Sequence, residues 1–258
     1  MQEEHPWEAV FTNIQGTMNL MDASEDYKVE RFVLVSTDKA VNPTNIMGAT
    51  KRVAEKLIQS KSIDSKVKYM AVRFGNVIGS SGSVIPTFQE QIRNGGPVTI
   101  TNPKMQRCFM SISEAAQLIL QAGAMGSGGE VYVLDMGKPV NIKDIAYELI
   151  RLSGLEPEKD ISIEYIGSRP GEKLYEELQT KDENILDTDH EKIFMMKNGN
   201  GNNWDHLLGR VDKIINSAKL YDVNKVMDSL KIFNPEYVPD YTNEADWVQK
   251  TANKIINN

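Results

Sequence analysis

Helical and strand-like patterns of apolar residues alternate along the first two thirds of the chain. Apolar residues recur every three or four positions over residues 6–23, which predicts an amphipathic helix, and residues 31–36 form a short β-branched run typical of a buried parallel strand. The same two patterns follow three more times. The further predicted helices cover residues 46–60, 113–125 and 142–152, and the further predicted strands cover residues 67–73, 130–135 and 161–166. This alternation predicts an α/β fold built from βαβ units around a parallel sheet.

The pattern becomes more polar beyond about Thr180. Residues 198–203 contain only Asn and Gly and predict a loop. Polar helical patterns follow at residues 204–219, 223–230 and 243–256. Residues 181–258 are therefore expected to form a helical C-terminal tail.

Composition narrows the class of protein. The 258 residues include 29 Lys and Arg against 36 Asp and Glu, a net charge of −7, and 40% are hydrophobic. This acidic balance argues against a coat for nucleic acid or for an anionic membrane, but it permits a local site for a phosphorylated small molecule. The single cysteine, Cys108, cannot form an internal disulfide, and no Cys/His cluster predicts a metal site. No apolar run approaches the roughly 18 residues of a membrane span, so we expect a cytoplasmic protein without direct membrane contact.

Candidate chemistry lies just after the first predicted strand. Thr37, Asp38 and Lys39 follow its carboxyl end, the edge at which open parallel sheets bind ligands. Met47 and Lys51 are four residues apart on the next predicted helix and therefore share one of its faces. A carboxylic acid beside a lysine offers a proton donor and a proton acceptor. The same spacing also suits a turn with a surface ion pair and a solvated lysine.

Residues 36–52, STDKAVNPTNIMGATKR, resemble the active-site segment of the extended short-chain dehydrogenase/reductases. The similarity is greatest to the nucleotide-sugar 4,6-dehydratases of polysaccharide and glycan biosynthesis, and it extends over residues 13–192. The superfamily's usual tyrosine is replaced by Met47, whose thioether cannot carry a proton. The membrane-anchored UDP-N-acetylglucosamine 4,6-dehydratases share this methionine. The proton of the sugar 4-hydroxyl must then pass to Thr37, to Asp38 or to a water held by them.

The resemblance implies an NAD- or NADP-dependent lyase that converts UDP-N-acetylglucosamine into a UDP-4-keto-6-deoxy sugar. It makes Lys39 the base at C5, Asp38 the general acid at C6 and Lys51 the residue that holds the nicotinamide ribose. The implied cofactor contacts are Asn13, Ser36, Lys51, Arg73 and Phe74. A 5-epimerising dehydratase, or another nucleotide-sugar epimerase, is an alternative of the same class. A non-catalytic module that binds nucleotide sugars is an alternative of another class.

Three later motifs are candidates for substrate binding. Residues 73–86 form a glycine- and serine-rich loop whose backbone can approach a ligand closely. Arg107 follows a short strand pattern, and the planar guanidinium of arginine suits a diphosphate. Arg169-Pro-Gly-Glu172 predicts a turn that presents both charged side chains in one direction. The resemblance places the following residues at the UDP-sugar: Asn76, Ser83, Val84, Ile85, Val98, Thr99, Arg107, Arg169 and Glu172.

The sequence contains no Gly-x-Gly-x-x-Gly motif, which the family carries in its first βα turn. The resemblance therefore assigns residues 1–80 to the C-terminal half of a Rossmann domain and residues 81–180 to a substrate-binding portion. Within this portion, residues 113–140 are expected to contribute a further strand to the sheet of the Rossmann domain. We expect a partial doubly wound parallel sheet whose exposed edge favours self-association or a homo-oligomer. The resemblance also implies that a region N-terminal to this one anchors the parent protein in a membrane.

Overall fold

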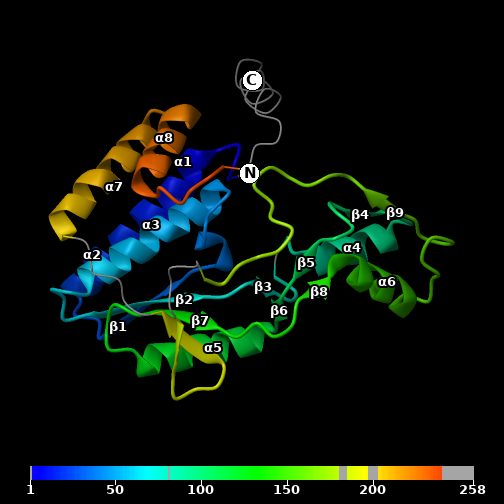
Figure 1. The fold of residues 1–258 in the computed structure, drawn as a ribbon, viewed down its shortest axis with the longest axis horizontal. Helices are drawn as coiled ribbons and strands as arrows, with labels where there is room; N and C mark the ends of the chain where they lie inside the picture. Colours follow the sequence, from blue (N-terminus) through cyan, green and yellow to red (C-terminus); the bar gives the residue numbers. More distant parts are fainter. Residues whose placement is uncertain (1, 81, 180–184, 197–202, 240–258) are drawn as a thin grey trace.

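The computed structural model describes residues 2–80, 82–179, 185–196 and 203–239. These residues form a larger α/β lobe and a smaller lobe beside it (Figure 1). The segments 198–202 and 243–256, predicted as loop and helix, lie outside the described residues. No described helix is both long enough and apolar enough to cross a bilayer.

A five-stranded sheet forms the centre of the larger lobe, in the order β1-β2-β7-β11-β10. Strands β1 (Arg31–Val35), β2 (Lys68–Arg73) and β7 (Val131–Leu134) are parallel to one another. Every residue of β2 after Lys68 is buried, as expected of a central parallel strand covered on both faces. The predicted α/β class with a parallel, Rossmann-like sheet is therefore confirmed.

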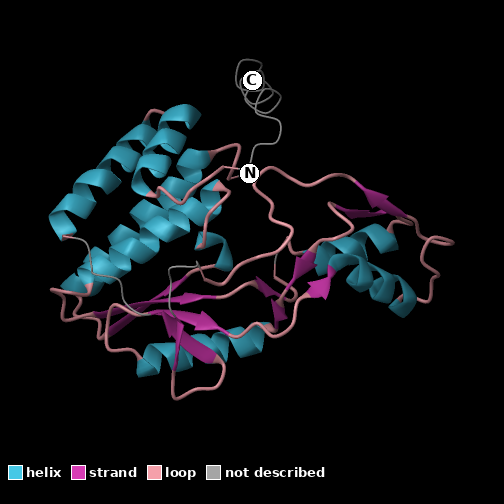
Figure 2. Cartoon of the chain, viewed as in Figure 1, coloured by secondary structure: helices cyan, strands magenta, loops and turns pink. Residues whose placement is uncertain are grey.

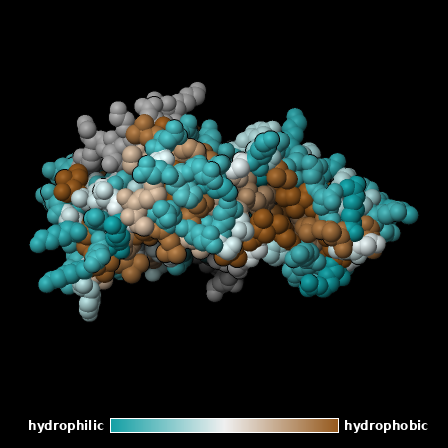
Figure 3. All heavy atoms as spheres, turned by 90° about the horizontal axis from the view of Figure 1, so that it is seen from below, coloured by the Kyte–Doolittle hydropathy of each residue, from teal (hydrophilic) through white to brown (hydrophobic). Residues whose placement is uncertain are grey.

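Helices cover both faces of this sheet (Figure 2). One face carries α1 (Pro6–Ala9), η1 (Val10–Gln15), α2 (Gly16–Asp26), α3 (Ile46–Lys61), α7 (Trp204–Lys219) and α8 (Val223–Phe233), and the other carries α5 (Ile112–Met125). The helix predicted over residues 6–23 contains a π-helical segment, η1, that the apolar period did not reveal. In Figure 3 the face with α5 is mainly polar, and apolar side chains gather toward the smaller lobe.

The smaller lobe consists of two packed helices and short strand pairs. The helices are α4 (Val84–Arg93) and α6 (Ile142–Leu152). The pairs are β4 (Val98–Ile100) with β9 (Ile163–Tyr165), β3 (Asn76–Val77) with β6 (Phe109–Met110), and β5 (Gln106–Arg107) with β8 (Val140–Asn141). The short 3₁₀ helix η2 (Asp38–Ala40) links β1 to α3.

Two expectations about the later elements need correction. The strand predicted over residues 161–166 does not join the main sheet. Helix α6 packs on α4 and β4, and the strand that follows it, β9, therefore pairs with β4. The segment after residue 180 is not only helical, since β10 (Ile185–Asp187) and β11 (Ile193–Met196) add two antiparallel strands beside β7. Helices α7 and α8 pack on α1 and α3 and so form part of the larger lobe.

Candidate active site

A cavity of about 730 Å³ lies where the carboxyl ends of β1 and β2 meet the smaller lobe. Its volume falls in the usual range of small-molecule sites. Segments far apart in the sequence line it, including residues 37–47, 75–88, 99–109 and 166–176. Ten of the predicted site residues are among the lining residues: Thr37, Lys39, Met47, Asn76, Ser83, Val84, Thr99, Arg107, Arg169 and Glu172.

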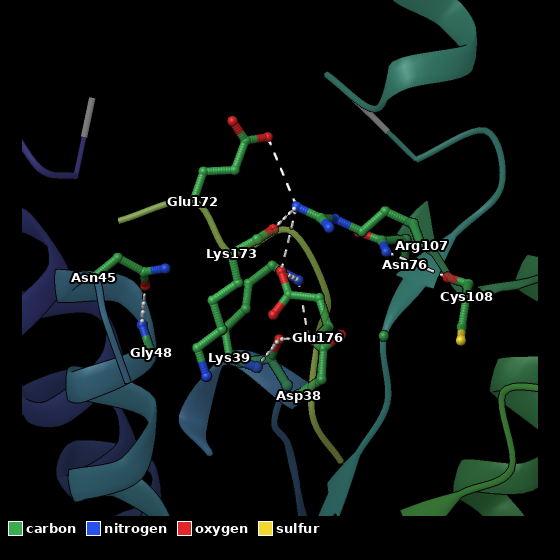
Figure 4. Close-up of polar contacts among 12 residues, drawn as sticks. Asp38, Lys39, Asn45, Gly48, Asn76, Arg107, Cys108, Glu172, Lys173 and Glu176 are labelled. Atoms are coloured by element: carbon green, nitrogen blue, oxygen red, sulfur yellow. Dashed lines mark hydrogen bonds and ion pairs between the residues drawn. The ribbon is translucent and has the colours of Figure 1, made fainter. Parts of the chain in front are cut away.

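Thr37, Asp38 and Lys39 form a hydrogen-bonded group at the end of β1. Thr37 Oγ1 and Lys39 Nζ each donate to Asp38 Oδ1, at 2.9 Å. Asp38 is 2% exposed, whereas its two partners line the cavity (Figure 4). Gly75 leaves room beside this carboxylate, because a Cβ there would lie 3.0 Å from Asp38 Oδ2. A buried acid and a cavity-lining lysine, two groups able to take part in acid–base chemistry, are thus in direct contact.

Helix α3 brings Met47 and Lys51 to the same strand end. Asn45 caps its N-terminus, since Asn45 Oδ1 accepts from the N–H of Gly48 at 2.8 Å. Lys51 Nζ donates to the carbonyl of Val35, the last residue of β1, at 3.1 Å. Burial lowers the pKa of Lys51, and the negative charge of Glu55 one turn later partly opposes this shift. The shared helical face predicted from four-residue spacing therefore lies above the strand end.

Arg107 links the cavity to the segment that follows the Arg-Pro-Gly-Glu turn. Its side chain is 9% exposed, and its guanidinium donates to the carbonyls of Lys173 at 2.8 Å and Leu174 at 3.1 Å. Glu172 Oε1 lies 3.7 Å from Arg107 Nη2, while Glu172 Oε2 accepts from the N–H of Arg169 at 3.1 Å. This positive group is therefore held in place at the cavity wall.

Glu176 is a cavity residue that the sequence patterns did not single out. Its Oε1 lies 3.6 Å from Lys39 Nζ and 3.7 Å from Arg107 Nη2. Burial raises the pKa of Glu176, the charge of Lys39 opposes this shift, and the nearby carboxylate of Asp38 adds to it. In the sequence Glu176 resembles any solvated glutamate, and the adjacent Glu177 offers the same signal. The sequence therefore carried no feature that distinguishes the two.

Two buried polar atoms at the cavity indicate a polar ligand. Ser83 Oγ and Glu176 Oε2 are shielded from solvent and have no hydrogen-bond partner among the described residues. Both residues line the cavity. Buried polar atoms in folded proteins are usually paired, so an unpaired atom that faces a cavity suits a bound group.

Three predicted cofactor residues instead make connections inside the protein. Arg73 is fully buried and pairs with Glu55 of α3 through two 2.7 Å contacts. Ser36 donates to the same Glu55 at 2.6 Å, and Asn13 donates to Thr50 Oγ1 at 3.0 Å. Arg73 and Ser36 thus join the sheet to α3, and Asn13 joins η1 to α3.

Three predicted contact residues pack in or against the protein core or lie on α4, outside the cavity lining. Val98 is fully buried in the core of the smaller lobe, where it packs with the apolar face of α6. Phe74 packs against the core beneath β2 and β7, and Ile85 is partly buried on α4. None of these three is among the residues that line the cavity in the described part of the chain.

The residues at the end of β1 fit the nicotinamide end of a dinucleotide. Lys51 offers an ammonium group over the strand end, and Gly75 keeps the adjacent corner free of a side chain. The sequence holds no glycine-rich turn for the phosphates of such a cofactor. Among the described residues, no group of three His, Cys, Asp or Glu side chains could hold a metal ion.

Gly171 sets the path of the Arg-Pro-Gly-Glu turn. Its φ is +72°, and a Cβ there would lie 2.8 Å from both Asn45 Cβ and the carbonyl oxygen of Thr44. We expect Gly171→Ala to lower the free energy of unfolding by about 2–4 kcal/mol, because backbone strain and a clash add together. Gly167→Ala is the matched control, since Gly167 has φ +84° but no atom within 4 Å of an added Cβ. Urea unfolding should show a loss of only about 1–2 kcal/mol for the control; equal losses would contradict the steric argument.

An acid–lysine pair at the carboxyl edge of a parallel sheet, beside a cavity lined by a buried arginine, is typical of ligand-binding α/β proteins. A family model described as polysaccharide biosynthesis protein matches residues 1–198. The chain belongs to this polysaccharide biosynthesis protein family. The predicted relationship to the nucleotide-sugar branch of the extended short-chain dehydrogenase/reductases is confirmed.

Individual relatives show how much of a longer protein the chain represents. The capsular polysaccharide biosynthesis protein CapD of Staphylococcus aureus is 58% identical over 198 residues, which cover 76% of this chain and 33% of CapD. The uncharacterized membrane protein MJ1061 of Methanocaldococcus jannaschii is 44% identical over 239 residues, or 88% of this chain and 71% of that protein. The chain thus spans about a third of the length of CapD.

A solved structure shows the same architecture. Pen from Bacillus thuringiensis superposes with a TM-score of 0.71 at 39% identity, over 77% of this chain and 62% of Pen. The dTDP-glucose 4,6-dehydratase DesIV of Streptomyces venezuelae, solved with NAD, has a TM-score of 0.60 at 21% identity, over 66% of this chain and 57% of DesIV. The likeness to DesIV concerns the fold alone.

Proposed function

We propose that this chain supplies the substrate-binding and acid–base part of a nucleotide-sugar 4,6-dehydratase. The proposed substrate is UDP-N-acetylglucosamine and the proposed cofactor is NAD or NADP. The observation that carries the proposal is the direct contact, at 2.9 Å, between the buried Asp38 and Lys39, which lines the same cavity as Arg107. A base and a phosphate-binding cation in one cavity, with an acid in contact with the base, match what dehydration of a sugar diphosphate needs.

The proposed reaction removes water from C5 and C6 of the sugar. When bound, the cofactor would supply the oxidation at C4 by accepting a hydride, which it later returns at C6. The resulting 4-keto group makes the C5 proton acidic. Lys39 removes this proton, and Asp38 protonates the departing C6 hydroxyl, so that one water leaves. In the last step Lys39 gives the proton back to C5, which completes the 4-keto-6-deoxy sugar.

The neighbours of this pair orient the groups that react. Thr37 donates to Asp38 Oδ1, and Lys51, which contacts the end of β1, is proposed to hold the nicotinamide ribose. The C4 hydroxyl loses its proton to Thr37, to Asp38 or to a water between them, because Met47 cannot accept it. Arg107 and Arg169 are proposed to bind the diphosphate, and Glu172 the ribose hydroxyls.

An epimerase is the second candidate, because a curated UDP-glucose 4-epimerase of Rickettsia bellii is 38% identical over 184 residues, 70% of this chain. An epimerase inverts a ring carbon without loss of water. The two activities, and a 5-epimerising dehydratase between them, are therefore distinguished by the mass and the ring stereochemistry of the product.

Binding and turnover can be measured separately on the purified chain. We expect isothermal titration calorimetry to show binding of UDP-N-acetylglucosamine, and NMR to show no 4-keto product after addition of NAD. This outcome follows from the absence of a glycine-rich phosphate turn in this sequence. A 4-keto product would show that the chain is a catalyst by itself. Failure to bind either UDP or the UDP-sugar would overturn the proposed function.

The proposed parent enzyme is an oligomer, since β1 forms an edge of the described sheet and an open edge can pair with another chain. A cytoplasmic location of this part, with anchoring through another region of the parent protein, belongs to the same proposal.

A further inference from the structure

Glu176 connects the two charged ends of the cavity. The same oxygen, Oε1, lies within 3.7 Å of Lys39 Nζ at one end and of Arg107 Nη2 at the other. The side chain is 10% exposed, and Figure 4 shows it between these two cations. One carboxylate therefore fixes the distance between the proposed base and the proposed phosphate-binding group.

The backbone that carries Glu176 is itself held in place. Arg107 donates to the carbonyls of Lys173 and Leu174, and Lys173 Nζ donates to the carbonyl of Val41 at 3.0 Å. Val41 follows directly after η2, the short helix of the acid–base pair. The segment that bears Glu176 is thus attached both to the smaller lobe and to the catalytic corner.

The second oxygen of Glu176 is available to a ligand. Oε2 is buried without a hydrogen-bond partner among the described residues, and Glu176 lines the cavity. An unpaired carboxylate oxygen inside a protein is costly, so its retention calls for a donor that is bound during function. The adjacent Glu177 differs, since it is half exposed and binds Lys173 and Asn42.

The position of Glu176 suggests which part of the ligand supplies this donor. In a nucleotide sugar, C1 of the hexose bears the diphosphate and C5 loses the proton. If Arg107 holds the diphosphate and Lys39 meets C5, the hexose ring lies along Glu176. The donors on that ring are its hydroxyls and the N–H of an acetamido group, and both suit a carboxylate acceptor.

We propose that Glu176 is a positioning and sugar-recognition residue: Oε1 holds Lys39 and Arg107, and Oε2 accepts a hydrogen bond from a hydroxyl or N–H of the hexose. This proposal rests on the proposed function, because it takes a nucleotide sugar as the ligand. It adds a contact with the sugar itself to the predicted contacts with nucleotide and diphosphate.

The test compares UDP with UDP-N-acetylglucosamine, because only the latter has a hexose. In Glu176→Gln the amide oxygen can still face Lys39 and Arg107. The NH₂ group then takes the place of Oε2, and it cannot accept a hydrogen bond from a donor on the ligand. We expect calorimetry to show an affinity for UDP-N-acetylglucosamine about 10- to 100-fold lower, the usual effect of a lost hydrogen bond to a charged group. The affinity for UDP should stay within about threefold. Glu177→Gln is the matched control and should bind both ligands as the wild type does.

One further variant and one further ligand locate the effect. Glu176→Asp keeps the acceptor and should recover part of the affinity for the UDP-sugar, which a purely structural role would not predict for a shorter side chain. If Glu176→Gln does not fold, Glu176→Asp carries the same comparison of the two ligands. UDP-glucose, which has a hydroxyl in place of the acetamido group, shows whether the donor is the N–H.

The outcomes separate this proposal from the proposed function. Equal losses of UDP and UDP-sugar affinity in Glu176→Gln would show that Glu176 acts on Arg107 alone and would overturn the sugar contact. Unchanged affinities would overturn the whole proposal for Glu176. A wild-type chain that binds neither ligand would overturn the proposed function first, and the role of Glu176 with it.

Discussion

Asp38→Asn and Lys39→Met, made in a complete enzyme that binds the cofactor, are each expected to lower the dehydration rate about 10²- to 10⁴-fold. Asp38→Asn keeps the shape of the side chain but removes the acidic proton for the C6 hydroxyl. Lys39→Met keeps a similar length but removes the base at C5. The two side chains are in contact at 2.9 Å, so each variant also removes the partner of the other.

Deuterium exchange distinguishes the two roles. In D₂O, Asp38→Asn should retain exchange of the C5 proton while elimination at C6 is slow, and Lys39→Met should lose both. Glu156→Gln and Lys159→Met are the controls. These two residues form an exposed ion pair, with 2.8 Å between Lys159 Nζ and Glu156 Oε2, and neither lines the cavity. Dehydration at wild-type rates in both site variants would contradict the assigned roles.

Arg73→Leu is expected to lower the free energy of unfolding by about 3–5 kcal/mol, the usual cost of removing one partner from a buried ion pair. Arg73 and Glu55 are both fully buried and make two contacts of 2.7 Å. Burial alone would raise the pKa of Glu55, but Arg73, Arg52 and the Ser36 hydroxyl together hold it below its ordinary value. Without Arg73, the carboxylate would keep its desolvation cost and lose its main partner.

A second variant and a surface pair test the cause of this loss. Glu55→Leu combined with Arg73→Leu should recover much of the stability, because no unpaired charge then remains inside. Arg151→Leu is the control, since Arg151 also contacts a glutamate, Glu148, at 2.7 Å but is 59% exposed. In urea unfolding, Arg151→Leu should lower the free energy of unfolding by less than about 1 kcal/mol. Similar losses for Arg73→Leu and Arg151→Leu would contradict the argument from burial.

This buried pair also explains why a sequence motif can suggest the wrong partner. Arg73 ends β2, at the edge of the sheet where ligands bind, so a cofactor contact was a reasonable prediction. The direction of the Arg73 side chain depends on α3, which brings Glu55 next to the end of β2. Spacing along the chain did not relate residues 55 and 73, because neither helical nor strand periodicity connects two separate elements.

The local patterns were sufficient for the elements that form the catalytic corner. The apolar run of β1 and the amphipathic period of α3 predicted both elements close to their observed bounds. The Thr37-Asp38-Lys39 triplet and Lys51 then met at one strand end, because strand direction and helical period fix their positions relative to each other. Glu176 had no such pattern around it.

The amino-acid sequence was sufficient for the alternation of helices and strands, the acidic composition and the family of the chain, because each depends on residues that are near one another, on overall composition or on a continuous motif. The tertiary structure alone decided that residues 185–196 add two antiparallel strands and that β9 leaves the main sheet. It also decided which of two adjacent glutamates lines the cavity, and that Arg73 pairs with Glu55 inside the protein whereas Arg107 lines the cavity. Contacts between separate elements set these features, because neither helical nor strand periodicity relates residues of different elements.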